Sequence, residues 1–301
     1  MHYPYVTADV FSASVFGGNP LAVITDAQGL SDAQMQAIAR EFNYAETAFV
    51  LPATLEGAAK RVRIFTPMAE VPFAGHPNVG TAVVLARSGT LGSVRPGTQI
   101  VFEELAGPVP ITLLGEGEEI TGAELTAPTI KPLGSEIAPA EAAVLLSLRE
   151  EHICFGRHPP VVASAGLAFL MVELSNLTAL GSAHVDVGRL AALERAHDFN
   201  GVFLYTAEPS EAAPDFRARM FAPSHGIPED PVTGSANAAL GILLASATAT
   251  ETGTLRWTVE QGVEMGRPGR VEITAVRSNW EVTQIRIAGR AVEVCRGGMT
   301  L

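Results

Sequence analysis

Short segments rich in β-branched and aromatic residues occur in both halves of the chain, and most of them alternate polar and apolar positions as half-buried strands do. They cover residues 62–65, 99–105, 109–114, 216–221, 254–259 and 270–276. Two further segments favour helices, because Ser31 can cap residues 32–42 and Asp186 can cap residues 187–196. Each half is therefore expected to mix α and β elements.

Three short motifs recur in the same order in the two halves: A-[RH]-[ED]-F-N, R-[IM]-F-x-P and P-x-x-G-[ST]-A. Their copies begin at Ala39, Arg63 and Pro77 and again at Ala196, Arg219 and Pro231, with separations of 157, 156 and 154 residues. Three ordered matches at nearly one separation predict two halves with the same fold. The glycine-rich, charged segment 115–122 is the expected boundary between them.

The third motif predicts one buried helix in each half. The residues after Pro77 and after Pro231 are small or apolar on nearly all sides, and a helix of that composition must be buried. Glycine and proline in the preceding loops allow the backbone to turn sharply. If the halves face each other, two positive helix N-termini would meet at one cleft, which would favour a carboxylate or an enolate.

Candidate chemistry lies in these two turns and in one asymmetric position. His76 and Asp230 each precede the motif proline and are interpreted as equivalent, and Ser235 follows in the second turn. Glu46 has no counterpart in the second half and stands beside apolar residues. A carboxyl group in apolar surroundings has a raised pKa, which suits a group that carries protons in both directions.

Composition narrows the function class. The chain has 301 residues, 47% of them hydrophobic and 17% charged, which supports two packed domains rather than disorder. Its net charge of −12 argues against binding nucleic acid by phosphate neutralisation. With two cysteines, no signal-peptide pattern and no long apolar run, we expect a cytoplasmic protein without a membrane partner. The spacing of His152, Cys154 and His158 fits no familiar zinc pattern, so no metal is expected.

Several segments resemble the PhzF-like family of phenazine biosynthesis isomerases. The matching stretches are residues 9–23, 39–50, 63–82, 219–241 and 261–269. The resemblance implies an α+β fold similar to diaminopimelate epimerase, with two pseudo-symmetric lobes. Each lobe would wrap a curved sheet or barrel around a central buried helix, with the active site between the lobes. We expect residues 1–118 with 284–301 in the N-terminal lobe and residues 119–283 in the C-terminal lobe.

The resemblance also assigns roles to individual residues. Glu46 matches the family's acid/base glutamate, His76 its G-H-P histidine and Asp230 its E-D-P aspartate, which together form the expected catalytic set. The expected substrate-binding residues are Gly75, Gly234, Ser235 and Asn19, the last within a G-N-P signature interpreted mainly as structural. Ala45 stands where the family often has serine, which would remove one hydroxyl contact to the ligand.

The implied function is a cofactor-independent isomerase that moves a proton on a small unsaturated carboxylic acid, as in trans-2,3-dihydro-3-hydroxyanthranilate isomerisation. No cofactor is expected, and the resemblance suggests a homodimer. One alternative is a member of the fold that binds a small acid or a protein without turnover. Another is an epimerase or a dehydratase-type proton-transfer enzyme. Two-cysteine racemisation is disfavoured, because Cys154 and Cys295 lie outside both turns.

Overall fold

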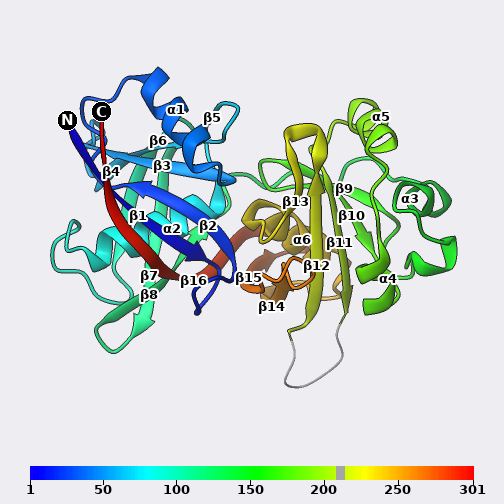
Figure 1. The fold of residues 1–301 in the computed structure, drawn as a ribbon. Coiled ribbons are helices and arrows are strands. Elements are labelled where there is room, and N and C mark those ends of the chain that lie inside the picture. The colour runs from blue at the N-terminus through cyan, green and yellow to red at the C-terminus, as the bar shows by residue number, and fades with distance from the viewer. Residues whose placement is uncertain (208–213) are drawn as a thin grey trace. The chain divides into compact units, whose positions relative to one another are not determined.

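A computed structural model describes residues 1–207 and 214–301, which form two compact units. The first unit comprises Met1–Thr126 and Ala288–Leu301, and the second comprises Ala127–Ile287. Both chain termini belong to the first unit and lie side by side (Figure 1), with the Leu301 amide donating to the Met1 carbonyl at 3.0 Å. The expected boundary segment 115–122 instead contains the turn between two paired strands of the first unit.

The first unit is a closed barrel around a helix. Its elements are β1 (His2–Val10), β2 (Asn19–Ile24), α1 (Asp32–Phe42), β3 (Glu46–Leu51), β4 (Lys60–Phe65), β5 (Glu70–Val71), α2 (Gly75–Arg87), β6 (Gln99–Glu104), β7 (Gly107–Glu116) and β8 (Glu119–Thr126). The strands follow the order β1-β2-β3-β4-β6-β7-β8-β16, and β16 (Glu281–Thr300) closes the barrel by pairing with β1. Residues 75–85 of α2 are buried, as the sequence predicts.

The second unit repeats this plan as an open sheet. Its elements are α3 (Pro139–Leu145), η1 (Glu150–His152), β9 (Val161–Ser164), β10 (Ala168–Glu173), α4 (Leu177–Ser182), α5 (Val187–His197), β11 (Val202–Ala207), β12 (Phe216–Ala222), η2 (Pro223–His225), β13 (Ile227–Asp230), α6 (Gly234–Ala247), β14 (Gly253–Gln261) and β15 (Gly269–Ser278), followed by β16. The strand order is β16-β15-β14-β12-β11-β10-β9. Helix α6 contacts β9, β10, β14 and β15, and nearly all of its first twelve residues are buried.

Strand pairing confirms the predicted α+β fold with two pseudo-symmetric lobes. In the first unit β2 pairs parallel with β3 and β4 pairs parallel with β6, while β3 and β4 are antiparallel. The second unit repeats these pairings with β10 and β11, β12 and β14, and β11 and β12. The expected helix caps are present too, because the Ser31 and Asp186 side chains accept from the backbone amides of Gln34 and Arg189.

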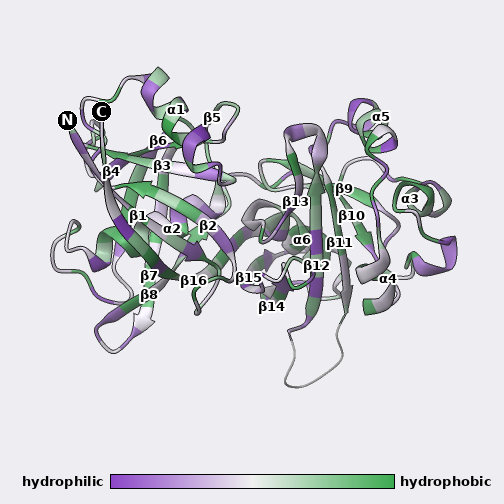
Figure 2. Ribbon diagram, viewed as in Figure 1, coloured by the Kyte–Doolittle hydropathy of each residue, from purple (hydrophilic) through white to green (hydrophobic). Residues whose placement is uncertain are grey.

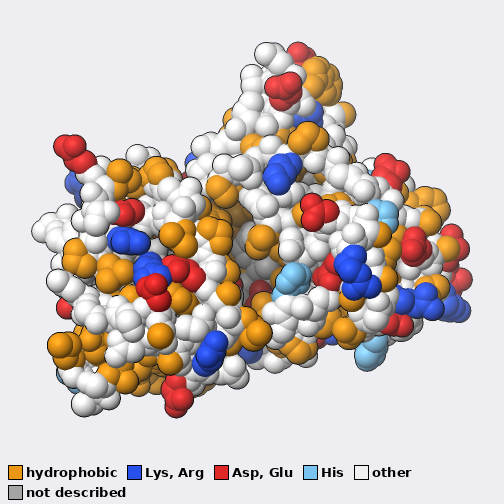
Figure 3. Space-filling model, turned by 90° about the horizontal axis from the view of Figure 1, so that it is seen from above, with side chains coloured by type: hydrophobic (Ala, Val, Ile, Leu, Met, Phe, Trp, Pro, Cys, Tyr) orange, Lys and Arg blue, Asp and Glu red, His pale blue; other side chains and the backbone are white. Residues whose placement is uncertain are grey.

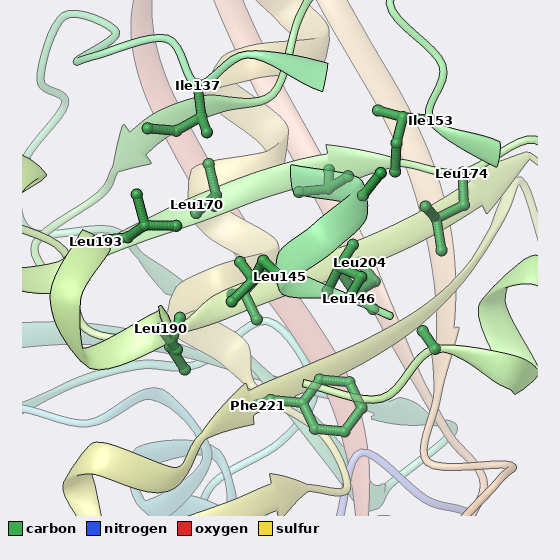
Figure 4. Packing of buried hydrophobic residues seen from close by; sticks show 14 of the residues in the cluster. Ile137, Leu145, Leu146, Ile153, Leu170, Leu174, Leu190, Leu193, Leu204 and Phe221 are labelled. Atoms are coloured by element: carbon green, nitrogen blue, oxygen red, sulfur yellow. The ribbon is translucent and has the colours of Figure 1, made fainter. Parts of the chain in front are cut away.

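The outer helices pack on the sheets by one face only. In the second unit, leucines of α3 and α5 meet leucines of β10 and β11 in a buried cluster that also includes Phe221 (Figure 4). Figure 2 shows α5 carrying both hydrophobic and hydrophilic residues, as a helix with one buried face requires. On the face shown in Figure 3, acidic and basic side chains of the described residues are interspersed, without a broad basic field. No described helix is long and apolar enough to cross a membrane.

Candidate functional site

Within the first unit, Glu46 and His76 meet although 30 positions separate them in the sequence. Glu46 begins β3 opposite Leu21 of β2, and His76 is the second residue of α2. Helix α2 lies very close to the strands, since a Cβ added at Gly80 would be 2.5 Å from the Leu21 side chain. This packing brings His76 Nδ1 within 3.2 Å of Glu46 Oε2.

The imidazole of His76 is neutral at physiological pH. Burial lowers its pKa to about 3, and a hydrogen bond with the Pro20 backbone opposes this with a smaller effect. Its 3.2 Å contact with Glu46 is therefore that of a neutral ring rather than an ion pair. Such a contact can hold one proton, either on the imidazole Nδ1 or on the carboxyl Oε2. The Glu46 side chain keeps 16% of its surface exposed, so it remains accessible while His76 is enclosed.

The start of α2 is suited to negative charge. Ala74 is its N-cap and offers no side-chain acceptor, and the first turn contains no acidic residue. The positive end of the helix is therefore not neutralised by its own first turn. Gly75 is the buried first residue of this helix, and Asn19 is buried at the start of β2, opposite Val10.

Within the second unit, Asp230 belongs to a buried hydrogen-bonded turn before α6. The Thr233 hydroxyl donates to Asp230 Oδ2 at 2.5 Å, and Gln261 Nε2 donates to the Asp230 carbonyl at 2.9 Å. Gln261 Oε1 accepts from the Thr233 amide and from Asn237 Nδ2, each at 3.1 Å. Helix α6 then begins at Gly234, and Ser235 is its second residue.

The sequence comparison between the halves was wrong by five residues at this point. The structure aligns the segments E-x-P-x-x-G-x-x-N at 70–78 and 229–237, so the counterpart of His76 is Ser235 and that of Asp230 is Val71. Pro77 lies inside the first turn of α2, where proline is tolerated, whereas Pro231 precedes α6. The matching prolines therefore do not occupy matching positions.

This alignment also reveals side chains that sequence reasoning missed. Glu229, which is absent from the candidate set, pairs bidentately with Arg219 at 2.8 and 3.0 Å. Its counterpart Glu70 pairs with Arg63 at 2.7 and 2.6 Å. In both halves an arginine of the second repeat motif is followed by a glutamate, 7 residues later in the first half and 10 in the second, and this shared order was the signal that could have found them. These pairs join β4 to β5 and β12 to β13, directly before the two central helices.

The remaining candidates are distributed as follows. Glu46, His76, Gly75 and Asn19 belong to the first unit, and Asp230, Gly234 and Ser235 belong to the second. Cys154 is half-buried and Cys295 is exposed, and neither lies in the first turn of α2 or α6. His158 contacts the Tyr205 hydroxyl instead of joining Cys154 and His152. Among the described residues, no group of three histidine, cysteine or acidic side chains could hold a metal ion.

Comparison with known proteins shows which sequences and structures this chain is similar to. A family model described as phenazine biosynthesis-like protein, PhzC-PhzF, matches residues 8–297. The chain is 37% identical over 297 residues to an uncharacterized isomerase of Mesorhizobium japonicum, covering 97% of both chains. It is 33% identical over 294 residues to the trans-2,3-dihydro-3-hydroxyanthranilate isomerase of Pseudomonas aeruginosa, covering 97% of this chain and 98% of that one.

Solved structures agree on the fold. The structure of a Bacillus anthracis phenazine biosynthesis protein of the PhzF family superposes with a TM-score of 0.87 at 27% identity and full coverage of both chains. A hydroxyproline epimerase from Agrobacterium vitis superposes with a TM-score of 0.66 at 14% identity, over 99% of this chain and 92% of that one. At that identity the likeness concerns the fold alone, and it supports the expected epimerase-like architecture.

Proposed function

Because the chain belongs to the phenazine biosynthesis-like PhzC-PhzF family and is a PhzF-like isomerase, we propose that it moves a proton on a small unsaturated carboxylic acid. Glu46 is the acid/base group, and the reaction uses neither a metal nor an organic cofactor. The substrate to test first is trans-2,3-dihydro-3-hydroxyanthranilate, since a relative that is 33% identical over nearly the whole chain carries that name.

The contact between Glu46 and His76 is the observation that carries this proposal. The Glu46 carboxylate takes a proton from one carbon of the substrate, and the C–H bonding electrons move into the conjugated double bonds. The same carboxyl group then returns the proton to a second carbon, so atoms and charge balance over the cycle. His76 Nδ1, 3.2 Å away, orients the carboxyl group and hydrogen-bonds it in either protonation state.

The other candidates bind the substrate and stabilise charge. The amides at the starts of α2 and α6, including those of Gly75 and Gly234, stabilise negative charge on the carboxylate or on the dienolate intermediate. Asp230 and Ser235 hold polar substituents of the substrate, with Asp230 fixed by the Thr233 hydroxyl. Asn19 supports the turn before β2.

Proton NMR in D₂O tests the proposal. Wild type incubated with trans-2,3-dihydro-3-hydroxyanthranilate should consume it and incorporate deuterium at carbon. Glu46→Gln should turn over at least about 100-fold more slowly, because general acid/base catalysis contributes roughly 10²–10⁴-fold, and should still bind. Glu41, an exposed glutamate of α1, provides the matched control, and Glu41→Gln should behave as wild type. Equal turnover by Glu46→Gln and wild type would refute the assigned role.

The same experiment separates the alternatives. A protein that only binds small acids would show ligand-induced shifts but no deuterium incorporation in any variant. A dehydratase would release water and give a product with a new double bond rather than an isomer. An epimerase would exchange the proton and return it to the same carbon. A homodimeric, cytoplasmic protein remains part of the proposal, to be checked by light scattering of the purified chain and by cell fractionation.

A further inference from the structure

Glu104 is a buried carboxyl group that the proposed reaction does not use. It is the last residue of β6, its side chain shares the inward face with Ile100 and Phe102, and it is 8% exposed. The polar side chain that contacts it is Asn78, the fourth residue of α2. Glu104 therefore lies inside the barrel, against the first turn of the helix that carries His76.

The second unit has Gln261 at the equivalent position. Strands β4 and β6 pair with Arg61 opposite Glu103, and β12 and β14 pair with Arg217 opposite Glu260. The next residue along the second strand of each pair is Glu104 in one unit and Gln261 in the other. Repeat symmetry thus places a carboxyl group in one unit where the other unit has an amide.

In the second unit the amide fastens the start of the central helix. Gln261 binds the Asp230 carbonyl, the Thr233 amide and Asn237, and Asn237 in turn donates to the Thr233 carbonyl at 2.9 Å. In the first unit Asn78 makes the same bond, donating to the Ala74 carbonyl at 2.9 Å. The helix starts are therefore built alike, and Glu104 stands where Gln261 completes the network.

We propose that Glu104 is a positioning residue that acts as a protonated carboxyl group, holding Asn78 and the first turn of α2 as Gln261 holds Asn237 and α6. A carboxylic acid offers one hydrogen-bond donor, its O–H group, and one acceptor, its carbonyl oxygen. A side-chain amide that uses one N–H group and its oxygen offers the same pair, whereas a carboxylate can only accept. Among the described residues, Asn78 Oδ1 and both Glu104 oxygens are buried without a well-formed hydrogen bond. As Gln261 Oε1 accepts from Asn237 Nδ2, a carboxyl oxygen of Glu104 can accept from Asn78 Nδ2, while the proton keeps the group neutral inside the barrel and gives it a donor, as the amide gives Gln261.

The surroundings of Glu104 also favour its protonated form. Burial raises the pKa of Glu104 to about 8, and the contact with Asn78 lowers it by less. The adjoining elements carry Lys60, Arg61 and Arg63 on β4, Glu103 on β6, Glu116 on β7, and His76 and Arg87 on α2. None of these groups contributes to the raised pKa of Glu104. Arg61 lies 3.9 Å from Glu103, whose side chain alternates to the other face of β6, and His76 is neutral against Glu46. None of them provides a cation for an ionised Glu104.

Thermal unfolding between pH 5 and 9, without any substrate, tests this proposal. A folded-state pKa of about 8 lies above the ordinary glutamate pKa of 4.5, so the stability from the protonated form is complete below about 4.5 and is lost as pH rises towards 8. The Tm of wild type should therefore fall over this range relative to Glu104→Gln, which keeps a neutral donor. Glu103→Gln is the matched control, and its Tm should follow the wild-type pH dependence through this range.

A second measurement, amide hydrogen exchange, reports whether the first turn of α2 stays ordered. Amide hydrogen exchange of His76 and Asn78 should stay slow in Glu104→Gln at pH 8.5 and be at least about tenfold faster in wild type. The reciprocal Gln261→Glu should create the same pH dependence at the start of α6. Parallel Tm curves for wild type and Glu104→Gln, or equal exchange in the two proteins at pH 8.5, would overturn the proposal. Since no substrate is used, these outcomes are independent of the proposed reaction. Only the inference that Glu104 also positions His76 for catalysis rests on the proposed function.

Discussion

At the scale of single residues, the chemistry depends on which buried groups keep their charge. His76 and Glu104 are both enclosed, and burial favours the neutral form of each. For the histidine this lowers the pKa, and for the glutamate it raises it. Two neutral groups therefore flank the first turn of α2, and the neighbouring Glu46 side chain is partly exposed, which supports its proposed acid/base role.

The imidazole of His76 should not titrate between pH 5 and 8. A folded-state pKa of about 3 lies below the ordinary histidine pKa of 6.5, so the stability linked to the neutral ring is complete above about 6.5 and is lost as pH falls towards 3. Histidine ring shifts measured by NMR check this, with the His76 resonance assigned by its disappearance in His76→Asn. A His76 resonance with a midpoint near 6.5 would contradict the assignment of a neutral ring.

At the scale of secondary-structure elements, the close approach of α2 to the barrel wall positions Glu46 and His76. Gly80 permits it, because a Cβ there would lie 2.5 Å from Leu21 Cδ2 and 2.6 Å from Val10 Cγ2. Leu21 is also the partner of Glu46 in the β2–β3 ladder. A shift of the helix would thus change the distance between Glu46 and His76.

Gly80→Ala should lower the free energy of unfolding by about 1–3 kcal/mol, the usual cost of overpacking a core. It should also reduce turnover more than Gly181→Ala does. Gly181 lies in α4, and a Cβ there would meet nothing within 4 Å, so its substitution should be neutral or slightly stabilising. Urea unfolding of both variants gives the comparison. Equal free energies of unfolding for Gly80→Ala and wild type would show that the Leu21 and Val10 side chains can shift to accommodate the added methyl group without destabilising the fold.

The sequence predicts an element well where neighbouring residues determine it, and poorly where distant parts of the chain determine it. Capping by Ser31 and Asp186 and strand alternation are local signals, and the corresponding helices and strands are confirmed within a few residues. The repeat was visible, but its third motif was aligned on the wrong proline, because a proline in the first turn of a helix and a proline before a helix look alike in the sequence. Glu104 was missed altogether, since only tertiary packing distinguishes a buried strand-end glutamate from an exposed one.

At the scale of the whole molecule, the chain crosses from the second unit back to the first. The last strand, β16, leaves the second unit at Ile287, and its residues 291–300 pair with β1. This pairing is the closure of the first barrel, so the fold of the N-terminal segment depends on residues almost 300 positions away. Closure also removes the exposed edges that β1 and β8 would otherwise present.

Deletion of residues 288–301 should therefore unfold the first unit selectively. Without its closing strand the barrel would lose the ladder to β1 and open a path for water to α2. Hydrogen exchange followed by mass spectrometry should show lost protection in β1, β2 and α2, with α6 still protected. Deletion of Leu301 alone, which removes only its hydrogen bonds with Met1, is the control and should leave all four protected. If the long deletion kept α2 protected, the seven remaining strands would suffice to enclose it, and the return of the chain would be unnecessary for this barrel.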